Sequence, residues 1–311
     1  MRNKKKFLDG DVQKTNLTKK EKQDIQSIED SGATYENVGD GVPNYYGYEN
    51  SKGTKCLVVR KLTQSLIDSD QFGCCQSWNQ RSYGSEYGRE YNFVEEGLRL
   101  GSMLGRKLQV RGEETQLKFT RQNSGKIDKR MLAELGFGNS DVFSHTLTER
   151  YNKAYLHISV DASGSMSGDK WNQAMTSAVA MIKAADMSGT IDVVMSIRTT
   201  HSKNRGGSDV PMILVCYDSR TDKLVKVKNL FSALNVSGTT PEGLCFEAIQ
   251  KDLIPGNSTQ DSYFINFSDG QPYYGNSDIS YCGKSAEGHT RKMVGKMRDM
   301  GISVLSYFIG G

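Results

Sequence analysis

A carboxylate and two hydroxyls follow a strand-like segment in the second half of the chain. Residues 155–160 run directly into Asp161, and Ser163 and Ser165 follow at alternate positions. Side chains at alternate positions of a tight loop project to the same side, and Gly164 permits the sharp turn. An all-oxygen group without His or Cys is the ligand set that suits Mg²⁺ or Mn²⁺ rather than zinc.

Two further loops carry oxygen ligands of the same kind. Residues 237–243 (SGTTPEG) form a loop that enters a helix and supply a third hydroxyl, from a threonine. Residues 264–268 form an apolar strand that ends in Asp269, and Gly270 follows as a turn residue. Ligands of open α/β sheets bind at the carboxyl ends of the strands, so we expect these loops to converge.

The elements that must position these loops begin at residue 154. Strand-like segments there alternate with helix-like ones, which is typical of a Rossmann-like, mostly parallel α/β sheet flanked by helices. The predicted strands are 154–160, 191–197, 212–217, 225–230, 263–268 and 302–309, and the predicted helices are 169–187, a helix from Pro241 and 285–300.

The amino-terminal half lacks this alternation. Residues 1–90 are predicted to be a polar, largely irregular and poorly ordered arm, with a short strand at 57–59. Residues 91–153 are predicted to be a basic helical connector, in which a helix begins at Phe93. Glycines at 97, 101 and 105 each cost that helix up to about 1 kcal/mol relative to Ala, so it needs tertiary support.

The near-neutral overall charge shows that the chain is not a polycation. The 311 residues include 40 Lys and Arg against 36 Asp and Glu, a formal charge of +4. Between Arg106 and Arg130, eight basic and three acidic side chains leave a local charge of +5, which could serve nucleic acid or an acidic protein surface. A solvated linker is the favoured interpretation, because Phe119 alone is available there for base stacking. Nucleic acid is therefore not an expected partner.

The remaining motifs do not indicate catalysis. The six cysteines have no zinc-type spacing and are read as free thiols, and the four histidines are scattered. The sequence Gly283-Lys284-Ser285 resembles the end of a phosphate-binding loop, but Asp278 stands where that motif needs glycine. There is no apolar run of about 18 residues and no signal-peptide core, which predicts a cytoplasmic protein without a membrane span.

Asp161, Ser163 and Ser165, the Gly-Thr-Thr-Pro loop and Asp269 in Ser-Asp-Gly together resemble the metal-ion-dependent adhesion site of von Willebrand factor A-type (VWA) domains. The resemblance covers residues 154–311 and implies a VWA fold. In that family the two serines bind Mg²⁺ directly, and the two aspartates hold coordinated waters. The sixth coordination position is left for an acidic residue of a protein partner.

Thr240 is the threonine that this resemblance assigns to the metal, directly or through water. It is preferred to Thr239 because it stands just before Pro241 and three residues before Gly243, as in the family pattern. A VWA domain normally continues past its last strand into a closing helix, whereas this sequence stops at Gly311. We therefore expect a VWA domain that lacks its final helix, in a truncated or incomplete copy.

A narrower resemblance includes part of the amino-terminal half. Residues 95–111, 125–132, 142–143 and 147–150 are similar to the segment that precedes the VWA domain in the large subunit of aerobic cobaltochelatase. Members of that family work beside a MoxR-type AAA+ ATPase, and related pairs occur in bacteriophages, which would place the protein in host cytoplasm. The acidic low-complexity region of the chelatase subunit is missing here, and the Gly-Thr-Thr-Pro loop is closer to the general VWA pattern.

Three functions follow as hypotheses. The leading one is a non-catalytic, Mg²⁺-dependent interaction subunit that couples a MoxR-type AAA+ ATPase to metal insertion or to client remodelling. The second is a tetrapyrrole-binding core subunit of a cobalt or magnesium chelatase. The third is a generic VWA adhesion or binding module.

Overall fold

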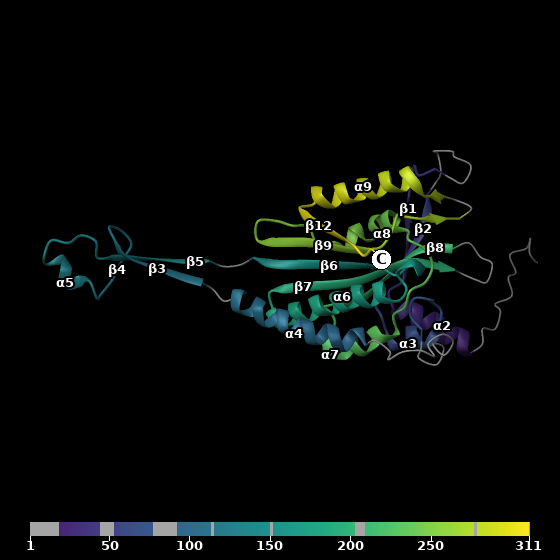
Figure 1. Cartoon of the computed structure of the whole chain (residues 1–311), viewed down its shortest axis with the longest axis horizontal. Coiled ribbons are helices and arrows are strands. Elements are labelled where there is room, and N and C mark those ends of the chain that lie inside the picture. Colours follow the sequence, from purple (N-terminus) through teal and green to yellow (C-terminus); the bar gives the residue numbers. More distant parts are fainter. Residues whose placement is uncertain are drawn as a thin grey trace, which may run out of the picture.

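The computed structural model describes residues 19–43, 53–76, 92–112, 115–149, 152–202, 209–276 and 279–310. A seven-stranded sheet lies at its centre, in the order β1-β2-β8-β7-β6-β9-β12 (Figure 1). These strands are β1 (Thr34–Val38), β2 (Thr54–Val59), β6 (Lys153–Asp161), β7 (Ile191–Ser202), β8 (Asp209–Asp218), β9 (Gln260–Ser268) and β12 (Ile302–Phe308). Four of the neighbouring pairs are parallel, and β1–β2 and β7–β8 are antiparallel. The predicted α/β class with a mainly parallel sheet is confirmed.

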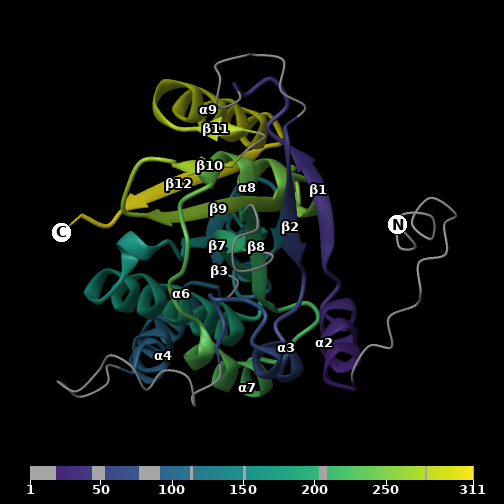
Figure 2. The ribbon, with the colours of Figure 1, turned by 90° about the vertical axis from the view of Figure 1, so that its right-hand side faces the viewer.

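Helices cover both faces of this sheet (Figure 2). One face carries α3 (Gln64–Ser69), α4 (Phe93–Gly112), α6 (Asp169–Ser188) and α7 (Leu224–Val227), and the other carries α8 (Glu242–Ile249) and α9 (Gly283–Asp299). The helix α2 (Lys19–Asp30) packs against α3. Within the residues that the structure describes, every helix is too short or too polar to cross a lipid bilayer.

One predicted strand is wrong. Residues 225–230 lie in α7 and in a 3₁₀ helix, Lys228–Ala233, instead of a strand. Leu224, Val227 and Phe231 are buried at helical spacing, whereas Val225 is exposed. The apolar run therefore packs by helical periodicity, which a short segment does not distinguish from strand alternation.

The amino-terminal arm contributes to the central sheet, which corrects its prediction as largely irregular. Its strand β2 is paired on both sides, in parallel with β8 and in antiparallel fashion with β1. Cys56 and Val58 are buried in the cluster under α8, while Leu57 and Val59 are buried in the cluster under α6. The strand β1 is an edge strand with one buried side chain, Val38, so its sequence carries little apolar signal.

The glycines of α4 allow it to approach α6 closely. A Cβ atom at Gly97 would lie 2.7 Å from Cβ of Val179, and one at Gly101 would lie 2.5 Å from the carbonyl oxygen of Ala180. Side chains at these positions would push the two helices apart. The predicted helix at Phe93 is confirmed, and the support that it needed comes from α6.

Replacing Gly101 by Ala should destabilise the protein, although Ala is the better helix former by about 1 kcal/mol. The new methyl group would meet backbone of α6 that cannot move aside, a contact of the kind that costs about 1–3 kcal/mol. Gly288 in α9 is the matched control, because a Cβ there meets nothing within 4 Å. Chemical denaturation should show that Gly101→Ala loses stability and Gly288→Ala gains it. Equal gains at both sites would contradict the tight helix contact.

The second part of the connector is a small sheet rather than a helix, which corrects its prediction. After α4, the strands β3 (Thr115–Gln122), β4 (Lys126–Ile127) and β5 (Phe143–Glu149) pair in the antiparallel order β3-β5-β4, with the short helix α5 (Leu132–Leu135) between β4 and β5. This unit projects from the body at the amino end of β6 (Figure 1). The sequence Thr115–Gln122 alternates polar and apolar residues in part, which is typical of a strand.

No helix follows β12 within the described residues. Leu305 and Tyr307 on that strand remain about half exposed. The helix α4, which comes from the amino-terminal half, packs instead on α6. The edge of the sheet at β12 thus has less cover than its centre.

Candidate metal centre

Three loops meet at the carboxyl edge of β6 and β9. The amide of Ser237 donates to the carbonyl oxygen of Ala162 at 2.6 Å, and the amide of Gly164 donates to that of Gly238 at 3.1 Å. Gly238 has a φ of +71°, and a Cβ atom there would clash with the hydroxyl of Thr200. These backbone contacts hold the threonine loop against the Asp161 loop, as the sequence predicted.

The hydroxyls of Ser163 and Ser165 and the carboxylate of Asp269 form a continuous chain of oxygens. The two hydroxyl oxygens are 3.0 Å apart, and Ser165 Oγ donates to Asp269 Oδ1 at 2.8 Å. Adjacent ligands of an octahedral Mg²⁺ with bonds of 2.0–2.1 Å lie about 2.9 Å apart, by simple geometry. The spacing of the two hydroxyl oxygens therefore fits two adjacent ligands of the hard, six-coordinate ion that the ligand types suggested.

Asp161 supports this chain from beneath. Its side chain is fully buried, Oδ1 accepts the amide of Ser163 at 2.9 Å, and Oδ2 accepts the hydroxyl of Ser268 at 3.2 Å. Both oxygens are thus engaged by neighbouring protein groups. The carboxylate fixes the loop that carries the two serines, and it adds negative charge behind them.

Thr240 lies on the neighbouring loop and is buried. Its backbone amide and carbonyl pair with those of Tyr273, four residues past Asp269. Among the described residues, no hydrogen bond joins its hydroxyl to the other four predicted side chains. The adjacent Thr239 has a buried hydroxyl without a hydrogen-bond partner, so both threonines remain candidates for the third hydroxyl ligand.

Arg198 lies beneath the site and was missed by the sequence analysis. It is fully buried on β7, and its guanidinium donates to Glu242 Oε1 at 3.1 Å and lies 3.8 Å from Asp161 Oδ2. It also donates to the carbonyl oxygens of Ser159 and Phe267, on the two strands that carry the aspartates. An arginine directly after the apolar run 191–197 was the available signal, because Arg is rarely buried unless it is paired.

Lys170 was missed as well. Its Nζ lies 2.8 Å from Asp269 Oδ2, whereas Ser165 donates to the other oxygen of that carboxylate, Oδ1. It comes from the first turn of α6, directly after the serine loop. The predicted helix 169–187 includes this lysine, but nothing in the sequence indicated a role for it at the site.

Five of the six cysteines and the histidine of β6 are buried. All six cysteines are free, and burial raises the pKa of the Cys216 thiol well above its usual value. Burial also lowers the pKa of His157 to about 3, so its ring is neutral, and Nε2 pairs with Ser196 Oγ at 2.9 Å. No group of three His, Cys, Asp or Glu side chains is gathered for a metal in the described part of the chain, and the proposed site relies on hydroxyls instead.

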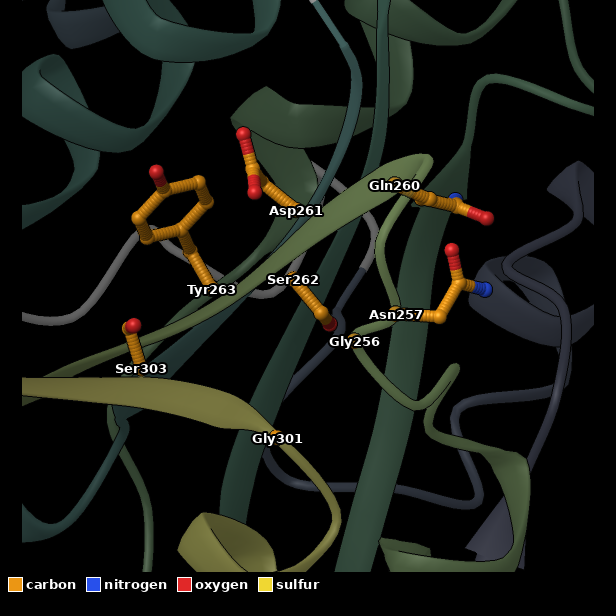
Figure 3. A pocket seen from close by; sticks show the side chains of 8 residues that line it. All are labelled: Gly256, Asn257, Gln260, Asp261, Ser262, Tyr263, Gly301 and Ser303. Carbon is orange, nitrogen blue, oxygen red and sulfur yellow. The ribbon is translucent and has the colours of Figure 1, made fainter.

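A polar pocket of about 280 Å³ lies at the other end of the sheet (Figure 3). Residues at the amino ends of β9 and β12 line it, among them Asn257, Asp261 and Tyr263. Small-molecule sites usually measure about 300–1,000 Å³ and are mostly apolar. This pocket therefore does not favour a large, flat ligand such as a tetrapyrrole.

Comparison with known proteins identifies no family. No protein-family model and no curated protein matches the sequence. Similar solved structures include two of the pilus adhesin SpaC from Lactobacillus rhamnosus GG, one of them in an open conformation, each 14% identical to this chain. They cover 51% of the chain with TM-scores of 0.37 and 0.36, and the chain spans 24% and 25% of their length. The function has to be inferred from the residues of the site.

Proposed function

We propose that the chain is a VWA-type, Mg²⁺-dependent interaction subunit that captures an acidic residue of a partner protein. The observation that carries this proposal is the chain of oxygens from Ser163 through Ser165 to Asp269, in which the two hydroxyl oxygens lie at the spacing of adjacent octahedral ligands. Mg²⁺, or Mn²⁺ in its place, would be held by these groups with Asp161 behind them and a threonine of the neighbouring loop, Thr240 by the family pattern. The bound ion would supply a positive charge that attracts a carboxylate.

The charges of the site support an acidic ligand. Asp161, Glu242 and Asp269 bring three negative charges, and Arg198 and Lys170 bring two positive ones, so the group as ionised carries −1. A divalent cation changes this to +1. One carboxylate from a partner then makes the buried group neutral, which is the favoured state where charges are removed from water.

The partner that fits the sequence resemblance is a MoxR-type AAA+ ATPase, acting with this chain in metal insertion or client remodelling. The support for this part is the cobaltochelatase-like pattern before residue 154. In the structure that segment forms α4 and the projecting sheet, and both lie outside the metal centre. The chain would work in the cytoplasm as a binding subunit without catalytic activity of its own.

A binding assay with a MoxR-type ATPase from the same genome tests this proposal. Wild-type protein should bind the ATPase in Mg²⁺ buffer, and Asp269→Asn should weaken the binding by more than about tenfold, or about 1.4 kcal/mol. A variant is used instead of a chelator because the ATPase needs Mg²⁺ itself.

Asp261→Asn is the matched control for this assay. Asp261 is an exposed carboxylate on the same strand, β9, at the end opposite Asp269. The Asp261→Asn variant should bind the ATPase as tightly as the wild type does. Equal binding by Asp269→Asn and wild type would show that the metal centre does not make the contact.

A further inference from the structure

Lys170 occupies an unfavourable place for a cation unless Asp269 requires it. The residue lies in the first turn of α6, where the helix dipole is positive and disfavours a lysine. Its Nζ nevertheless turns to Asp269 Oδ2 at 2.8 Å, and the side chain is 30% exposed against 2% for that of Asp269. The ion pair thus joins a nearly buried carboxylate to a cation at the rim of the site.

The carboxylates around the site are divided between two cations. Arg198 contacts Asp161 and Glu242 from below, and Lys170 contacts Asp269 from the side of α6. In the described part of the chain, Lys170 is the cation that neutralises the carboxylate at the end of the oxygen chain. A divalent ion held by that chain would lie next to the ammonium group and be repelled by it.

We infer that Lys170 is an internal counter-cation that competes with the divalent metal for Asp269 and so lowers the metal affinity of the site. This inference rests on the proposed metal centre. When the site is empty, Lys170 neutralises Asp269, which would otherwise be a buried, unpaired charge. When the metal enters, the flexible four-carbon side chain of Lys170 can withdraw into solvent, which it already reaches.

Competition between Lys170 and the metal determines under which conditions the site holds a metal ion. An ion that must displace Lys170 binds weakly alone, and it binds more tightly when a carboxylate of the partner adds negative charge to the same group. Metal and partner then bind together, and each raises the affinity of the other by the same factor. Without Lys170 the metal would bind more tightly in the absence of the partner.

The test is titration of the full chain with Mn²⁺, followed by electron paramagnetic resonance of the free ion, alongside thermal melts in metal-free buffer. Lys170→Met should bind Mn²⁺ at least about fivefold more tightly than wild type, within the usual range of coupling between two sites. The Lys170→Met variant should also melt at a lower temperature than wild type in metal-free buffer, because Asp269 loses its counter-charge. Lys170→Arg, which keeps the charge, should retain the weak affinity, and Lys170→Gln replaces Met if that variant does not fold.

Lys183→Met is the matched control. Lys183 lies on the same helix and makes a similar ion pair, Nζ to Asp186 Oδ2 at 3.1 Å, with 27% exposure, but it lies away from the site. Its Mn²⁺ affinity should equal that of wild type. Unchanged or weaker binding by a folded Lys170→Met or Lys170→Gln variant would overturn the competition while leaving the metal centre in place. Absence of Mn²⁺ binding by wild type and all variants would instead remove the metal centre, and the competition with it.

Discussion

Replacing both Ser163 and Ser165 by Ala is expected to abolish Mg²⁺ binding while the protein stays folded. The two hydroxyl oxygens lie 3.0 Å apart and form the centre of the oxygen chain, so their loss removes two adjacent ligands of the ion. Mutation of a residue that supports a metal ligand typically lowers the metal affinity about 10–100-fold. Loss of two ligands should therefore lower the Mg²⁺ affinity by more than about 100-fold. Isothermal titration with Mg²⁺ measures this directly.

Stability without metal should change by only about 1 kcal/mol per lost hydrogen bond in this double variant. Wild-type protein at 100 times its Kd should gain about 2.7 kcal/mol from the metal, and the variant should gain none. Ser167→Ala is the control, because Ser167 is exposed on the same loop and lies outside the predicted ligand set. A double variant that binds Mg²⁺ as tightly as wild type would rule out the site.

Arg198→Met should cause the largest loss of stability among these variants. The substitution leaves Glu242 and Asp161 buried without their shared cation, and removing one partner of a buried ion pair costs about 3–5 kcal/mol. At about 2–4 °C per kcal/mol for a chain of this size, the melting temperature should fall by at least about 6 °C. A thermal melt in metal-free buffer is the measurement.

Two further variants separate the charge effect from lost packing. Arg60→Met breaks a partly exposed pair with Asp252, at 3.1 Å, and should cost no more than about 1 kcal/mol. Adding Glu242→Gln to Arg198→Met should recover part of the loss, because one of the two buried carboxylates left without a cation is then replaced by a neutral amide. No recovery in the double variant would show that the arginine acts through its packing on Phe246 and not through charge.

Much of the fold and of the candidate site could be predicted from local patterns. The strands β6, β7, β8, β9 and β12 and the helices α6, α8 and α9 form at the predicted segments, because buried parallel strands and amphipathic helices carry continuous or periodic apolar residues. The loop Asp161–Ser165 could be placed at a strand end for the same reason. Asp269 could be predicted to lie near this loop, because the carboxyl ends of parallel strands lie at the same edge of the sheet.

The prediction failed where the decisive contact was not local. The edge strand β1 and the two-residue strand β4 carry little apolar periodicity, so pairing with a neighbouring strand determines them. The position of α4 also depends on a non-local contact, since Gly97 and Gly101 weaken the isolated helix and are explained by the close surface of α6.

The sequence by itself determined the kind of site that we propose, because residue types and their spacing decide which atoms could bind a hard cation and from which strand ends they come. Tertiary structure alone decided the electrostatics of that site. Arg198 lies 37 positions after Asp161 and 44 positions before Glu242, and Lys170 lies 99 positions before Asp269.

 Pairing across such separations leaves no local pattern in the sequence. It arises only when the sheet and α6 bring these strand ends and the first helical turn together, where burial makes each uncompensated charge costly.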